Sequence, residues 1–191
     1  MADMKRIIIL LSIILVLVGA FFGYKYYMSH KDADVENADD LACIKKADCI
    51  IYYYGDLIEL PSGFEYEKIT ELNFETMDFD HDSVFLIVNE LTAADYLSIN
   101  QVSELVDLAD RRSNFNFIYL GKESLSLFHE KIPTFLFDDD DLSFSYVMEE
   151  GNRLQVTGIL LQDYMQYAEK NKMLIADNVI SFIAKLVRKT M

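Results

Sequence analysis

The longest apolar run of the chain extends from Ile7 to Tyr24 and contains eighteen residues without a charged side chain. As a helix rising about 1.5 Å per residue, it would be roughly 27 Å long, close to the thickness of the bilayer hydrocarbon core. Lys25, Tyr26 and Tyr27 follow it, and these residue types favour the headgroup region. The pattern predicts a transmembrane helix within an N-terminal membrane anchor, residues 1–28, which contacts membrane lipid through residues 7–24.

A cleaved secretory signal is the alternative interpretation of the same segment. Lys5 and Arg6 provide its basic start, and Val18–Ala20 resembles a small-residue cleavage site. The apolar run continues from Phe21 without a polar break, which favours a retained anchor. Basic residues before the helix favour a cytoplasmic N-terminus. We therefore expect a single-pass protein of the cell membrane with an extracytoplasmic C-terminal domain.

Polar and acidic residues without an apolar period follow the anchor in SHKDADVENADDL, residues 29–41. This composition offers no apolar face to bury, so it predicts a flexible acidic spacer. We expect a single globular domain to cover residues 42–191.

Short apolar runs in that domain predict strands. Asp48–Tyr54 and Ser83–Asn89 are nearly continuous runs, as expected for strands that are buried on both faces. Asn116–Leu120 is a third run of this kind. Ile69–Phe74 instead alternates apolar and polar positions, which predicts a half-exposed strand.

The clearest helix signal begins at Ser98. Ser98 and Gln101 have the spacing of a capping box, and Leu97 and Val102 occupy the positions of a hydrophobic staple. Apolar residues then recur at helical spacing as far as Ala109. Since this helix lies between two buried strands with short connections, it predicts a right-handed βαβ unit with parallel strands.

The pattern changes after this unit. We expect a short helix over Lys122–Lys131 and a further strand over Thr134–Phe137. Residues 142–148 and 153–157 flank Glu-Glu-Gly-Asn and predict an antiparallel hairpin. Helical patterns follow over Leu160–Asn171 and from Asp177 onward. The predicted fold class is α/β: after the transmembrane helix, one small Rossmann-like three-layer domain with a central, mostly parallel sheet and a C-terminal β-hairpin plus two helices.

Composition and charge narrow the range of partners. The hydrophobic fraction of 52% is ample for the core of one domain. The formal net charge of −15 repels phosphate groups, so it excludes nucleic acid as a partner.

Cys43 and Cys49 are the two cysteines of the chain. In an oxidising compartment they could form a disulfide that closes a small loop at the entrance of the domain. The alternative is two small apolar residues that remain reduced. A zinc site would need two further ligands, and the sequence has no CxxC or HxxxH pattern to supply them.

Two acidic segments are candidates for binding a metal ion. Asp78, Asp80 and His81 form a dense group of ligand-capable side chains, and a run of four aspartates includes Asp138 and Asp140. Carboxylates suit Mg²⁺ and Ca²⁺, although the four contiguous aspartates lack the alternating DxDxDG spacing of a calcium loop. The alternative for both segments is a solvated acidic loop.

Motifs for other chemistry are absent from the sequence. It contains no GxSxG nucleophile elbow, no GxGxxG fingerprint and no GxxxxGK[ST] phosphate loop. We therefore expect no cofactor and favour a non-enzymatic function, as a protein-binding or accessory component of a cell-envelope complex with a protein partner at the membrane. The alternative is a membrane-tethered, metal-dependent hydrolase that uses the acidic loops.

Overall fold

The computed structural model describes residues 38–56, 60–91, 96–132, 134, 143–157, 172–189 and 191. Within these ranges, no helix is both long and apolar enough to cross a bilayer. The predicted anchor, the predicted strand over 134–137, the aspartate run and the predicted helix over 160–171 lie outside the described residues, apart from single positions at their ends. The compact unit described below is Asp40–Met191.

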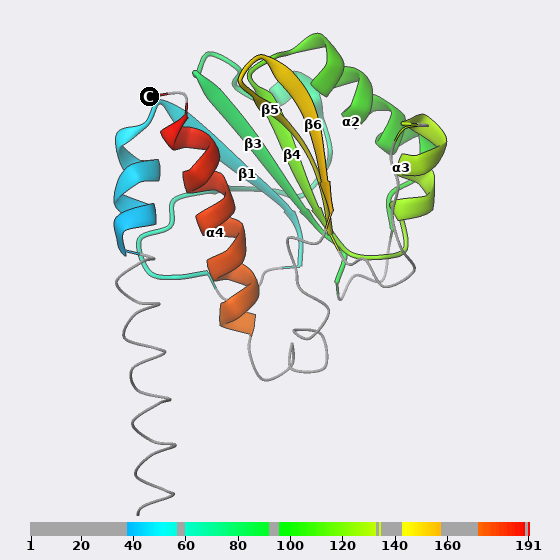
Figure 1. Cartoon of the computed structure of the whole chain (residues 1–191). Helices are drawn as coiled ribbons and strands as arrows, with labels where there is room; N and C mark the ends of the chain where they lie inside the picture. The colour runs from blue at the N-terminus through cyan, green and yellow to red at the C-terminus, as the bar shows by residue number, and fades with distance from the viewer. Residues whose placement is uncertain are drawn as a thin grey trace, which may run out of the picture. The chain divides into compact units, whose positions relative to one another are not determined.

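A six-stranded sheet, mostly parallel, forms the centre of this mixed α/β domain (Figure 1). Its strand order is β2-β1-β3-β4-β5-β6. The first four of these strands are parallel to one another, while β5 is antiparallel to β4, and β6 is antiparallel to β5. The bounds are β1 Cys49–Gly55, β2 Glu67–Ile69, β3 Ser83–Asn89, β4 Phe115–Leu120, β5 Ser143–Glu149 and β6 Asn152–Thr157.

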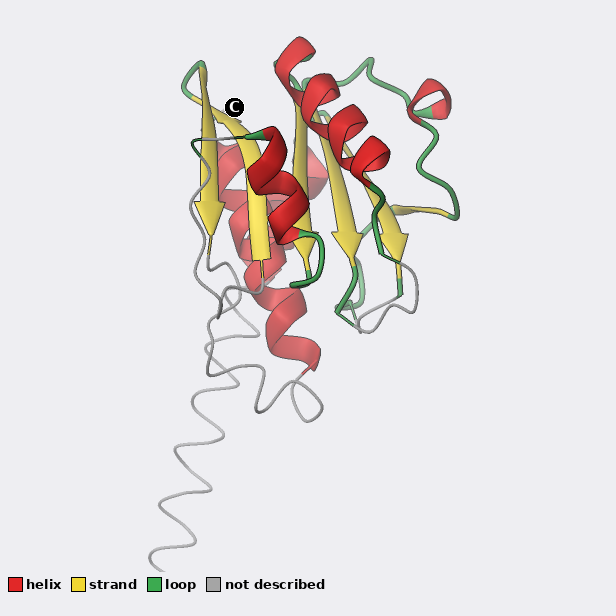
Figure 2. Ribbon diagram, turned by 90° about the vertical axis from the view of Figure 1, so that its right-hand side faces the viewer, coloured by secondary structure: helices red, strands yellow, loops and turns green. Residues whose placement is uncertain are grey.

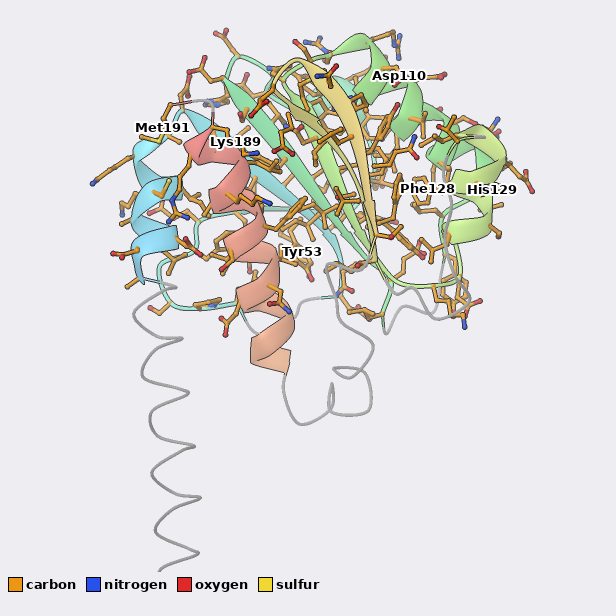
Figure 3. The ribbon with its side chains drawn as sticks, in the orientation of Figure 1. Tyr53, Asp110, Phe128, His129, Lys189 and Met191 are labelled. Carbon is orange, nitrogen blue, oxygen red and sulfur yellow. The ribbon has the colours of Figure 1, made fainter. Side chains whose placement is uncertain are left out.

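Helices pack on both faces of the sheet (Figures 1 and 2). They are the helix over residues 38–46, α2 (Ile99–Arg111), α3 (Leu125–Lys131) and α4 (Lys172–Arg188), with a single 3-10 turn, η1 (Phe74–Thr76). On the α2 and α3 side, Val102 and Phe128 belong to one buried cluster with Leu86 of β3. Phe128 is buried, whereas its neighbour His129 is exposed (Figure 3).

The opposite face of the sheet packs against α4 and the helix over residues 38–46. Ile44 and Ile183 belong to a second buried cluster with Phe85 and Ile87 of β3. Successive β3 side chains therefore enter opposite clusters, as the alternation of a strand requires. Both faces are covered, which explains why this strand is apolar at nearly every position.

Several local predictions are confirmed. The structure has β1, β3 and β4 where the apolar runs predicted strands, and α2 connects the parallel strands β3 and β4. Ser98 is the N-cap of α2, with both bonds of the capping box present. The predicted hairpin is formed by β5 and β6, and its turn residues Glu150 and Gly151 have φ of 50° and 79°. Positive φ at both positions matches the twist of a tight hairpin.

The strand predicted over Ile69–Phe74 is wrong for most of its length. β2 ends at Ile69, and Phe74 begins η1, whose N-cap Asn73 accepts a hydrogen bond from the Glu75 backbone N–H at 3.1 Å. Leu72 and Phe74 still pack against the core. The alternating pattern therefore predicted correctly that these two side chains are half-buried, but it did not predict the backbone conformation that buries them.

The folded unit begins earlier than residue 42. Residues 38–46 are helical, and the side chain of Asp40 is buried, although the sequence assigned it to the spacer. One carboxylate oxygen of Asp40 accepts a hydrogen bond from Ser181 Oγ at 2.6 Å, and the other accepts one from Arg188 at 2.5 Å. Both partners lie on α4, so the acid that looked solvated in the sequence joins the two helices of this face.

Arg153 of β6 joins the hairpin to the C-terminal end of α2. Its guanidinium donates to the backbone oxygens of Phe115 at 2.8 Å and Arg112 at 2.9 Å, and also to that of Ala109. The same group lies 5.2 Å from the ring centroid of Tyr146. Since the last carbonyls of a helix have no partner within the helix, Arg153 adds side-chain donors to the backbone cap at the end of α2.

Candidate functional site

The carboxyl ends of the parallel strands are the first place to look for a site. From β1 the chain goes to β2 on one side and then to β3 on the other, so the strand order reverses between β1 and β3. In open α/β sheets, ligands bind beyond the carboxyl ends of strands at such a reversal. In this chain, Asn89 and Glu90 stand at the carboxyl end of β3.

Asn89 connects the loop after β1 to the loop after β3. Its side-chain amide donates to the Tyr53 hydroxyl at 2.9 Å and to the backbone oxygen of Asp56 at 2.5 Å. Its side-chain oxygen accepts from the backbone N–H of Leu91 at 3.1 Å. Gly55 permits this approach because its φ is 103°, and a Cβ there would lie 2.1 Å from the Asn89 backbone oxygen. The arrangement therefore requires glycine at that position.

Glu90 is the centre of a second buried network, which we call the Glu90 cluster: Glu90, Tyr119 and Ser124. Glu90 is 5% exposed. Its Oε2 accepts hydrogen bonds from the Tyr119 hydroxyl at 2.7 Å and Ser124 Oγ at 2.8 Å, and its Oε1 accepts from the Leu97 backbone N–H at 2.5 Å. The Tyr119 hydroxyl in turn accepts from the Ser124 backbone N–H at 3.0 Å. Burial, followed by the hydrogen bond to Glu90, raises the pKa of the Tyr119 phenol, so it remains a donor.

The Glu90 cluster holds three parts of the chain together. Leu97 directly precedes the N-cap of α2, and Ser124 is the N-cap residue of α3. One carboxylate thereby fixes the starts of both helices to the end of β3. Because both carboxylate oxygens already accept hydrogen bonds and the group is almost completely buried, this geometry supports positioning of the loops more than proton transfer to a substrate.

Asn89 and Glu90 were not among the residues predicted from the sequence. The sequence did contain a pattern that could have indicated them. Two polar residues follow the apolar run of a predicted parallel strand, at the point where functional loops begin. Their partners could not be found in the same way, because Tyr119 and Ser124 are 29 and 34 residues from Glu90.

Three of the predicted metal candidates, Asp78, Asp80 and His81, lie at the other end of the sheet. Asp78 and His81 precede β3, and Asp48 precedes β1. His81 contacts both aspartates, and we call these three residues the His81 cluster. His81 Nδ1 is 2.7 Å from an Asp48 carboxylate oxygen, and its Nε2 is 3.8 Å from one of Asp78. The backbone N–H of Asp80 donates to the Asp78 carboxylate at 2.8 Å.

Metal binding by these residues stays a prediction. Within the described part of the chain, no three His, Cys, Asp or Glu side chains converge as a metal site would require. Asp138 and Asp140 lie outside the described residues, so the combination of both acidic segments is not decided by this geometry.

The His81 cluster should make stability depend on pH. The hydrogen bond to Asp48 raises the pKa of His81, and the same bond lowers the pKa of Asp48. His81 therefore contributes fully to the stability of the fold below its unfolded pKa of about 6.5. This contribution to stability is lost as pH rises through the higher pKa of the folded state. Asp48 contributes fully to the stability of the fold above its unfolded pKa of about 3.9. This contribution to stability is lost as pH falls through the lower pKa of the folded state.

We therefore expect His81→Gln to lower Tm most between about pH 4 and pH 6.5, and progressively less at higher pH. Thermal melts over this range would show it. The effect should be small, since 28% of the His81 side chain and 56% of the Asp48 side chain are exposed and water screens the pair. Asp48→Asn should remove most of the same pH dependence, because Asp48 is the largest cause of the raised His81 pKa. A Tm difference that stays constant with pH would contradict this assignment.

Cys43 and Cys49 are free thiols in the structure. The Cys49 thiol is 3.5 Å from the backbone oxygen of Ile44, and burial raises its pKa to about 11. It also lines a small pocket, about 100 Å³, between the helix over residues 38–46 and the loop around Phe64. A thiol with a raised pKa is a poor nucleophile, which supports the structural interpretation of this residue. The disulfide remains a prediction for an oxidising compartment.

No protein-family model matches the chain, and comparisons with curated proteins and with solved structures return no significant match.

Proposed function

We propose that this chain is a single-pass membrane protein whose Rossmann-like three-layer domain binds another protein of a cell-envelope complex, without catalysis. The apolar run of residues 7–24 supports the anchor, and the bias of basic residues supports an extracytoplasmic domain. Anchoring would confine the domain to the membrane surface and raise its effective concentration for partners there.

One observation supports the binding function: polar side chains at the carboxyl edge of the sheet form hydrogen bonds that hold the loops in place. Glu90 and Asn89 bond to the backbone or side chains of segments that begin or follow helices and strands. Such bonds make a rigid platform, and a rigid platform loses little entropy when it binds a partner.

The test is purification of the tagged full-length chain from native membranes after mild crosslinking, followed by mass spectrometry of captured proteins. We expect one or a few membrane or envelope proteins to be enriched over a control in which an unrelated single-pass protein carries the same tag. The N-terminal peptide in the same sample decides between anchor and signal, because a retained anchor includes residues before Ala20. Recovery of a chain that begins at Phe21 and binds no protein would refute the proposal.

A metal-dependent hydrolase tethered to the membrane is the second candidate. The observation that favours it is that His81 lies close to carboxylates of two separate segments, Asp48 at 2.7 Å and Asp78 at 3.8 Å. Calorimetric titration of the full-length chain with Mg²⁺, Mn²⁺ and Ca²⁺ would test it. Heat that is lost in His81→Ala would support this candidate, and no heat with any of the three ions would eliminate it.

A further inference from the structure

A groove of about 380 Å³ lies between η1 and α2. On the η1 side it is lined by Leu72, Phe74 and Glu75, and on the α2 side by Glu104, Leu108 and Arg111. Figure 2 shows that η1 and α2 lie on the same side of the sheet, and Phe74 and Leu108 contact the same buried cluster. The groove is therefore a surface feature of the face that α2 covers.

The α2 wall is one stripe of that helix. Glu104, Leu108 and Arg111 are spaced by four and three residues, which places them on the same side of the helix, along about two turns. The Nε of Arg111 donates to the backbone oxygen of Asp107 at 3.0 Å, so its guanidinium is held beside its own helix. The stripe therefore presents an acid, an apolar floor and a cation in that order.

The η1 wall is fixed by hydrogen bonds of its own. The Asn73 side chain caps η1, and Thr76 Oγ donates to the Asn73 backbone oxygen at 2.8 Å. Just beyond η1, the backbone N–H of Asp78 donates to the Tyr52 hydroxyl at 2.7 Å, which attaches the segment to β1. Both walls are thus held in place before any partner arrives.

Charged residues stand at the rim of the apolar floor. Glu75 and Glu104 supply one carboxylate on each wall, and Arg111 supplies one positive charge. Glu75 and Glu104 are exposed, so their carboxylates are accessible to a partner at the rim. An apolar floor between acids is complementary to an amphipathic segment with apolar side chains on one face and lysine or arginine beside them.

We propose that this groove binds a basic amphipathic helix of the partner protein. The inference rests on the proposed protein-binding function and adds the site and the chemistry of the partner. The helix would lie along α2, with apolar side chains against Leu72, Phe74 and Leu108 and its cations beside Glu75 and Glu104. A second copy of this chain suits the groove less well, because its net charge of −15 would repel the acidic rim.

The probe is a fluorescein-labelled peptide of about 18 residues with leucine and lysine in helical spacing, long enough to form a helix on binding. Its binding to the full-length chain in nanodiscs of zwitterionic lipid is measured by fluorescence anisotropy, and the signal from empty nanodiscs is subtracted. We expect the double variant Glu75→Lys/Glu104→Lys to weaken binding at least about tenfold, since it reverses two charges at the rim. Both positions are exposed, and circular dichroism verifies that the variant is folded.

The matched control is Glu123→Lys/Glu130→Lys, which makes the same change in net charge at exposed positions near or on α3. We expect it to change the Kd less than about twofold, because these residues do not line the groove. Equal weakening in both variants would mean nonspecific attraction to an acidic protein and would overturn the proposal. Undetectable binding of the peptide would overturn it as well.

The native partner gives an independent result. If a protein is captured from membranes by the unaltered chain and equally by Glu75→Lys/Glu104→Lys, the groove assignment is wrong while the binding function stands. If the unaltered chain sediments as a dimer and the same variant as a monomer, the occupant is a second copy and the proposal is overturned. Loss of the captured protein in this variant alone would support the groove.

Discussion

Arg153→Ala should lower the free energy of unfolding by about 3 kcal/mol, because hydrogen bonds to a charged group contribute roughly 1.5–3 kcal/mol each and are not fully additive. The substitution removes the donor that serves the backbone oxygens of Ala109, Arg112 and Phe115. It also removes the cation beside the Tyr146 ring. Urea unfolding of the detergent-solubilised chain, followed by far-ultraviolet circular dichroism, measures the change.

A control variant separates the effect of the positive charge of Arg153 from the effect of its planar hydrogen-bonding geometry. Arg153→Lys keeps the positive charge but lacks the planar fork that reaches several carbonyls at once, so it should recover less than half of the loss. Lys122→Ala, which removes an exposed cation near the start of α3, should change stability by less than about 0.5 kcal/mol. If Arg153→Lys matches the unaltered chain, net charge accounts for the effect and the capping role is wrong.

Glu90→Ala should be at least as damaging, with a loss of about 4 kcal/mol, since a buried donor left without its acceptor costs roughly 1–3 kcal/mol. Three donors lose their acceptor at once: the Tyr119 hydroxyl, Ser124 Oγ and the Leu97 backbone N–H. These donors lie at the end of β4 and at the starts of α3 and α2. We therefore expect faster hydrogen exchange in the first turns of both helices, measured by mass spectrometry alongside the urea unfolding.

Glu90→Gln tests how much of this loss depends on the two acceptor oxygens of the carboxylate. It preserves the shape and one acceptor oxygen, but its amide nitrogen cannot accept from the hydroxyl groups, so an intermediate loss of about 2 kcal/mol is expected. Glu123→Ala at an exposed position serves as the reference for an ordinary glutamate substitution. A loss below about 1 kcal/mol for Glu90→Ala would show that the loops are held by other contacts.

Features that depend on neighbouring residues were predictable from the sequence. The capping box at Ser98 and the apolar run of Ser83–Asn89 are local patterns, and each specified its element closely. The turn at Glu150 and Gly151 was also readable, because positive φ at two successive positions favours glycine in at least one of them.

Features that depend on distant residues were not predictable. Asp40 looked like one more acid in a polar segment, yet Ser181 and Arg188, 141 and 148 residues away, make it part of the core. Asp48 showed no sign of its pairing with His81, 33 residues later. The spacing of apolar residues does not predict which charged side chains will contact each other, because the sheet topology determines those contacts. The sequence predicted this topology only in outline.

The contacts of Asp40 also bear on how the protein is made. They join the first described helix to α4, which lie side by side although they come from opposite ends of the domain (Figure 1). A ribosome adds about 5–20 residues per second, and N-terminal parts emerge first. The face of the sheet that carries Phe85 and Ile87 therefore lacks its α4 cover until residues 172–188 have been synthesised. A truncation before α4 would leave this apolar face uncovered for chaperones and proteases to recognise.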